Sequence, residues 1–243
     1  RRAGRSRAGH RHRAGAARRV HLLTFRRDPD FAEQRAWMVE RQLHRRGISD
    51  QRVLAAMAEV PREHFIPENV RRSAYNDSAL PIGHDQTISQ PWVVAAICQA
   101  LRLDGDEQVL EIGTGSGYSA AVLSQLADHV VSIERVPELG DWARERLDEL
   151  GVGNVDVIVG DGSRGHPEGA PYDAIAVHAA SPEAPHSMLT ELAPDGRLVV
   201  PIATGSADLL TAFIRENGDL RQETIGPCRF VPLIGAEGFT PPD

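Results

Sequence analysis

From residue 108 onward, short apolar runs alternate with segments whose apolar residues recur at helical spacing. The apolar runs have the length of buried strands, which we expect over 108–112, 130–134, 156–160, 174–178 and 197–202. The helical spacing predicts helices over 118–127, 138–150 and 185–192. Two further strands, expected over 209–215 and 220–225, are separated by a short turn and should pair antiparallel at the sheet edge. The whole pattern predicts a doubly wound, Rossmann-like α/β sheet, mostly parallel with antiparallel C-terminal strands.

The part of the chain before residue 104 has a helical rather than an alternating pattern. Its polar, proline-containing stretch at 62–87 has little periodicity and is expected to be an ordered loop. A first helix is expected over 31–46 and ends at Gly47. A second is expected over 52–60, between Asp50 and Pro61. A third should begin at Ser89-Gln90-Pro91 and run to about 103. We therefore expect a tail at 1–28, N-terminal helices with an active-site loop at 29–104, and a cofactor-binding core at 105–243, with 29–243 as one folded unit.

Charge divides the chain into two parts. Its net charge is −7, but residues 1–27 hold ten Arg and no acid, which leaves 17 Arg against 34 acids in the remainder. An acidic body disfavours broad nucleic-acid binding. The arginine-rich start is expected to be disordered and dispensable, with a basic nucleic-acid arm or a transit peptide as alternatives.

Apolar runs and cysteines bear on where the protein acts. No apolar run approaches the roughly 18–20 residues of a membrane span. The two cysteines, Cys98 and Cys228, form no CxxC pair and are typical of a reduced, cytoplasmic protein. We expect a monomer that does not contact membranes.

Three alternating glycines follow the first expected strand, in the run Glu111-Ile112-Gly113-Thr114-Gly115-Ser116-Gly117. Glycines in such a turn let the backbone lie directly against a ligand. A dinucleotide-binding loop would need its third glycine at Tyr118, and a Walker loop needs a lysine, which this chain lacks altogether. An acid before a G-x-G-x-G loop instead suits a cationic ligand with an amino-acid tail, such as S-adenosylmethionine (SAM).

The ends of the next two strands carry matching chemistry. Glu134-Arg135 follows the second strand, where an acid is well placed to accept both ribose hydroxyls, and Asp161-Gly162 follows the third, near the expected adenine edge. Ligands of doubly wound sheets bind at these carboxyl ends. The expected cofactor-binding residues in this region are Glu111, Gly113, Thr114, Gly115, Ser116, Gly117, Glu134, Arg135, Asp161 and Gly162.

Several separate segments together resemble the protein-L-isoaspartate O-methyltransferase family. They include VPREHF at 60–65, ALPIGHDQTISQP at 79–91, GDGS at 160–163 and FVPL at 230–233, within a resemblance that covers about 32–239. The resemblance implies methyl transfer from SAM to the α-carboxylate of L-isoaspartyl residues in damaged proteins, with repair through a succinimide. It also implies that Ser89 is the active-site residue and that Thr87, Ile88 and Ser89 lie along the methionine end of SAM.

The chain departs from that family at His178, where a small residue is common. Structural or surface roles are expected for His178 and His84, a core position for Cys98, and no metal, because His178 and His186 alone are weak evidence for zinc. Ser89, taken by itself, is also consistent with a helix N-cap. Rival functions are a SAM enzyme that modifies a specific peptide or a tRNA, and a non-catalytic SAM-fold binding partner.

Overall fold

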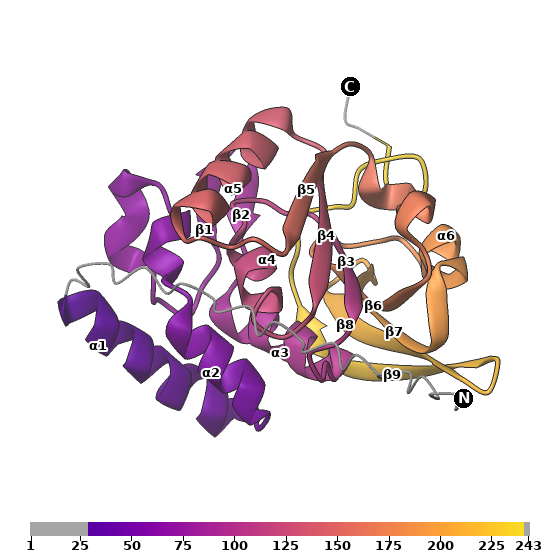
Figure 1. Cartoon of the computed structure of the whole chain (residues 1–243), viewed down its shortest axis with the longest axis horizontal. Coiled ribbons are helices and arrows are strands. Elements are labelled where there is room, and N and C mark those ends of the chain that lie inside the picture. The colour runs from indigo at the N-terminus through magenta and orange to yellow at the C-terminus, as the bar shows by residue number, and fades with distance from the viewer. Residues whose placement is uncertain (1–28, 241–243) are drawn as a thin grey trace, which may run out of the picture.

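A seven-stranded sheet with the order β5-β4-β3-β6-β7-β8-β9 forms the centre of the computed structural model, which describes residues 29–240 (Figure 1). The strands from β5 to β7 are parallel, and β8 and β9 continue the sheet antiparallel. Their bounds are β3 Gln108–Ile112, β4 His129–Glu134, β5 Val155–Val159, β6 Tyr172–Val177, β7 Leu192–Ala203, β8 Asp208–Glu216 and β9 Asp219–Cys228. The expected Rossmann-like sheet and its antiparallel edge are confirmed, while the arm expected at 1–28 lies outside the described residues.

Both faces of the sheet are covered, which explains why its central strands are almost entirely apolar. Along β3, Val109 packs into the core on one face and Leu110 into the core on the other. The first face is covered by α3 Pro91–Leu101, α4 Tyr118–Leu123 and α5 Pro137–Glu149, and α2 Gln51–Glu59 packs on α3 and α4. The short α6 His186–Thr190 packs on the second face through Met188. Cys98 is buried on α3, so its expected core position is confirmed.

The N-terminal helix is less regular than its periodicity predicts. The helix α1 Pro29–Trp37 continues as a π-helix over Met38–Leu43 and a 3-10 turn over His44–Arg46. A wider turn buries both Met38 and Leu43, which are five residues apart, on one side. Gly47 ends the segment with φ 95°, as expected for a glycine after a helix.

The segment 62–87 is not only a loop, so that expectation is wrong. It forms 3-10 helices over Arg62–Phe65 and Glu68–Ser73, followed by a hairpin of β1 Leu80–Gly83 and β2 Gln86–Ile88. His84 and Asp85 form the turn with φ values of 51° and 55°, the left-handed pair of a type I′ hairpin. The usual Asn-Gly or Asp-Gly signal is missing, and only packing against the rest of the protein holds so short a hairpin.

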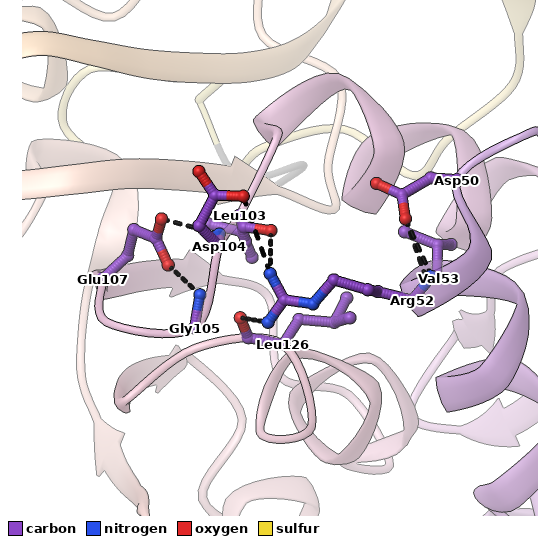
Figure 2. Close-up of polar contacts among 8 residues, drawn as sticks. All are labelled: Asp50, Arg52, Val53, Leu103, Asp104, Gly105, Glu107 and Leu126. Atoms are coloured by element: carbon purple, nitrogen blue, oxygen red, sulfur yellow. Dashed lines mark hydrogen bonds and ion pairs between the residues drawn. The ribbon is translucent and has the colours of Figure 1, made fainter.

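Arg52 connects the N-terminal helices to the sheet (Figure 2). Asp50 caps α2, accepting hydrogen bonds from the backbone nitrogens of Arg52 at 2.9 Å and Val53 at 3.4 Å. The Arg52 guanidinium donates to the carbonyl oxygens of Leu103, at 2.6 Å, and Leu126, at 3.4 Å. Helix α2 is thereby bound to the segment that leads into β3 and to the residues after α4.

No helix within residues 29–240 combines the length and the apolar character needed to cross a bilayer.

Candidate active site

A pocket opens at the carboxyl ends of β3, β4 and β6, beside the hairpin. It brings together most of the residues that the sequence assigned to the site, namely Thr87, Ile88, Ser89, Gly113, Thr114, Gly115, Ser116, Glu134, Arg135 and Gly162. The other assigned residues, Glu111, Gly117 and Asp161, do not line it. Further lining residues that sequence reasoning did not assign are Gln86, Val94, Ile112, Tyr118, Ser119, Ile133, Ser163, His178, Ala179, Val231, Pro232, Leu233 and Ile234.

The loop after β3 is built from left-handed glycines. Gly113, Gly115 and Gly117 have φ values of 91°, 56° and 91°, a conformation that residues with a Cβ rarely adopt. Gly117 does not reach the pocket; its N–H donates to the Thr114 carbonyl at 2.9 Å and closes the turn that starts α4. The loop therefore presents bare backbone to the pocket at Gly113 and Gly115.

Glu134 ends β4 and is almost completely buried. Its Oε2 accepts the backbone N–H of Gly115 at 2.8 Å, and its Oε1 accepts the backbone N–H of Val136 at 2.9 Å. Each carboxylate oxygen still has a lone pair available for another donor. Glu134 is thus oriented by the backbone on both sides, with capacity left for two ligand hydroxyls.

Ser89 lies between β2 and α3 and reaches the pocket from the hairpin side. The N-cap of α3 is Gln90, without a side-chain cap, so the N-cap alternative for Ser89 is wrong. Within residues 29–240 the Ser89 hydroxyl makes no hydrogen bond. A hydroxyl free of protein partners in a pocket is available to a ligand.

Glu111 lies behind the glycine loop instead of in the pocket, fully buried. Its Oε2 accepts the Ser132 hydroxyl at 2.5 Å, and that hydroxyl oxygen is 2.6 Å from the hydroxyl of Thr114 in the loop. Burial raises the pKa of Glu111 to about 7. Glu111 is therefore placed to affect a ligand only through Ser132, Thr114 and other side chains next to it, and not by direct contact.

His178 is the main correction to the sequence-based assignment, because it lines the pocket. It follows β6, and its Nε2 is 2.8 Å from the Ser119 hydroxyl and 3.4 Å from Glu111 Oε1. Burial lowers its pKa to about 4, so the imidazole is neutral at physiological pH. Its place after a strand adjacent to β3 was the available signal. The described residues include no group of three or more His, Cys, Asp or Glu side chains arranged to hold a metal.

Asp161 holds the C-terminal segment in place at the edge of the pocket. Its Oδ1 accepts the backbone N–H of Ser163 at 2.9 Å and its Oδ2 that of Ala236 at 3.0 Å. Nearby, the Leu233 N–H donates to the Ala180 carbonyl at 2.7 Å. These contacts bring residues 231–234 to the pocket wall, a long-range pairing that no local sequence pattern predicts.

The chemistry of these groups fits SAM. Glu134 offers two acceptors for a ribose diol, and the glycine loop allows close approach of the backbone. The Ser116 hydroxyl is buried in the pocket wall and has no hydrogen-bond partner among the described residues. An unsatisfied buried hydroxyl is costly, and a polar ligand in the pocket would relieve that cost.

Comparisons with known proteins show which sequences and structures this chain is similar to. The sequence model described as protein-L-isoaspartate(D-aspartate) O-methyltransferase matches residues 33–238. A Rhodopseudomonas palustris (strain HaA2) protein named protein-L-isoaspartate O-methyltransferase 1 is 56% identical over 86% of each chain. A Methanoculleus marisnigri protein named protein-L-isoaspartate O-methyltransferase is 49% identical over 85% of this chain and 94% of its own.

Two solved structures are also similar. One, named a protein-L-isoaspartate O-methyltransferase, has a TM-score of 0.74 and 31% identity, and the match covers 85% of this chain and 66% of the other. The other is a Plasmodium falciparum protein described by the same activity, in complex with S-adenosyl-L-homocysteine (SAH). It has a TM-score of 0.72 and 25% identity over 82% of this chain and 98% of its own.

Proposed function

The chain belongs to the protein-L-isoaspartate(D-aspartate) O-methyltransferase family, and we propose that it transfers a methyl group from SAM to the α-carboxylate of L-isoaspartyl residues in damaged proteins or peptides. The methyl ester then closes spontaneously to a succinimide, which hydrolyses in part to normal aspartate. One observation carries the proposal: the unpartnered Ser89 hydroxyl lies in the same pocket as the glycine loop and Glu134.

Residues from three strand ends hold the cofactor in this proposal. Glu134 accepts the ribose hydroxyls, the backbone of Gly113 and Gly115 lies along the ligand, and Gly162 borders the adenine side. Thr87 and Ile88 lie along the methionine end, as the family resemblance implies. When bound, SAM supplies an electrophilic methyl group on its sulfonium.

The acceptor requires little from the protein besides orientation. A peptide carboxylate has a pKa near ~3.5–4 and is already ionised at neutral pH, so no side chain has to remove a proton. The Ser89 hydroxyl donates a hydrogen bond to one carboxylate oxygen and leaves the other free to attack. The short hairpin of β1 and β2 brings Ser89 to the pocket, where its hydroxyl can orient the acceptor beside the methyl donor.

We further expect the protein to act as a monomer in a reducing compartment such as the cytoplasm. Its two cysteines are free thiols, with Cys98 buried and Cys228 half-buried. Sedimentation of the purified protein tests the oligomeric state, and fractionation of cells tests the compartment.

Methyl transfer from labelled SAM to one peptide, prepared in isoaspartyl and aspartyl forms, tests the proposed function. The isoaspartyl form should be methylated and the aspartyl form should be nearly inert. Equal rates on the two forms, or transfer to tRNA alone, would contradict the assignment. SAM binding without transfer to any acceptor would favour the non-catalytic alternative.

A further inference from the structure

A buried acid and a buried histidine meet at the base of the pocket, where the proposed reaction gives neither a role. Glu111 is fully buried, and its Oε1 has no hydrogen-bond partner among the described residues. The nearest polar group able to carry a positive charge is His178 Nε2, at 3.4 Å. His178 belongs to the pocket wall, whereas Glu111 does not.

The two ring nitrogens of His178 have different surroundings. Nε2 faces the Ser119 hydroxyl oxygen at 2.8 Å and the Glu111 carboxylate beyond it. The ionised Glu111 carboxylate can only accept, and the Ser119 hydroxyl can accept as well as donate, so we assign the proton of the neutral ring to Nε2. Nδ1 then keeps its lone pair, and it makes no hydrogen bond within residues 29–240.

Within residues 29–240, no fixed counter-charge contacts Glu111. The ionisable groups that face it are His178 after β6, Glu134 at the end of β4, and the Cys98 thiol on α3. The buried Arg62 guanidinium contacts a different group: it lies 4.9 Å from the centroid of the Tyr118 ring on α4. A cationic ligand group beside His178 would therefore lie close to an uncompensated buried acid.

The geometry points to His178 as the residue that binds the α-ammonium group of the methionine part of SAM, through Nδ1, while Ser119 and Glu111 hold the ring. This inference rests on the proposed use of SAM. Glu111 acts through His178 and is a positioning residue.

Two substitutions at His178 separate the two ring nitrogens. His178→Asn keeps a polar atom near the Nδ1 position, and His178→Gln keeps one near the Nε2 position. SAH binding, measured by titration calorimetry, should weaken at least tenfold in His178→Gln and less than threefold in His178→Asn. His186→Gln, which changes an exposed histidine on α6, is the matched control and should bind as wild type does.

A second ligand distinguishes an ammonium contact from a general effect of pocket shape. The SAH analogue in which hydrogen replaces the α-ammonium should bind the wild type and both variants within about threefold of one another. Equal losses for SAH and the analogue, or unchanged SAH binding in His178→Gln, would overturn the inference. If the wild type binds neither ligand, the proposed function fails instead.

Proton release gives an independent measurement of the same contact. A cation beside His178 favours ionised Glu111, so SAH binding near pH 7 should release a fraction of a proton, measured by calorimetry in buffers of different ionisation enthalpy. Glu111→Gln should abolish that release, and the analogue without the ammonium should not cause it. Equal release by wild type and Glu111→Gln would overturn the role of Glu111.

Discussion

Glu134 Oε2 accepts the backbone N–H of Gly115 at 2.8 Å, which joins the end of β4 to the glycine loop that follows β3. The two residues are 19 positions apart in the chain. Glu134 therefore shapes the loop that borders the pocket, and in the proposed function its remaining lone pairs accept hydrogen bonds from the ligand. Substitutions at this residue should change both stability and binding.

Glu134→Ala should weaken SAM binding by roughly 1.5–3 kcal/mol, the range for hydrogen bonds to a charged group. It should also lower the melting temperature, because the N–H groups of Gly115 and Val136 lose their acceptor. Titration calorimetry and thermal unfolding measure the two effects. Asp148→Ala, at an exposed acid on α5, is the control. Unchanged SAM affinity in Glu134→Ala would exclude its role in binding ribose.

Ser89→Ala should slow methyl transfer to the isoaspartyl peptide by roughly 10- to 100-fold while SAM affinity changes less than threefold. The physical reason is that the hydroxyl donates to the acceptor carboxylate, a charged group, and not to the cofactor. Single-turnover rates and calorimetry separate the two quantities. Ser78→Ala, at an exposed serine before the hairpin, should behave as wild type. A loss of SAM affinity equal to the loss of rate would place Ser89 on the cofactor instead.

The chemical step should be nearly independent of pH between roughly pH 6 and 8, because the acceptor carboxylate is fully ionised there. His84 lies exposed in the hairpin turn and is not expected to act as a base. Single-turnover methylation by wild type and His84→Gln, measured side by side, should give the same flat profile. A tenfold rise with pH that disappears in His84→Gln would show that a general base is required.

Glu111→Gln should stabilise the protein increasingly as pH rises. Burial raises the pKa of Glu111 from 4.5 to about 7, so the folded state holds a proton that the unfolded state releases between these values. The unfolding free energy of the wild type therefore falls across this window, by on the order of 3 kcal/mol for this one group. Gln mimics the protonated acid and does not titrate.

Chemical denaturation of wild type and Glu111→Gln at pH 5, 6.5 and 8 measures this difference. The pKa of His178 is lowered to about 4, so this residue raises the free energy of unfolding as pH rises from about 4 to 6.5. Both proteins contain His178, so the comparison between them isolates the effect of Glu111. A free-energy difference between the two proteins that stays constant from pH 5 to 8 would contradict the prediction.

Arg52→Ala should destabilise the protein by about 1–3 kcal/mol, because two part-buried carbonyl groups lose their charged donor. Those carbonyls belong to Leu103 and Leu126, and the guanidinium that contacts them is seen in Figure 2. Chemical denaturation gives the free energy of unfolding. Arg41→Ala, at an exposed arginine, is the control, and an equal effect of the two substitutions would argue against a specific role for Arg52.

Local patterns in the sequence determined the regular part of this structure. Buried strands must be apolar on both faces, so the parallel strands are visible as continuous apolar runs, and β3 lies where the pattern predicts it. The glycine loop is equally local, because a left-handed turn excludes most other residues. The position of Glu134 at the end of β4 is also predicted from the local pattern, because it is the acid that directly follows an apolar run.

Only the tertiary structure decided which polar groups face the pocket. Glu111 is the next-to-last residue of β3 and His178 directly follows β6, yet Glu111 is buried behind the loop and His178 lines the pocket. Their roles depend on the direction of each side chain and on contacts with Ser132 and Ser119, which come from distant parts of the chain. Spacing specifies which edge of the sheet a residue occupies. Packing between segments far apart in sequence decides what it touches there, and no local pattern carries that information.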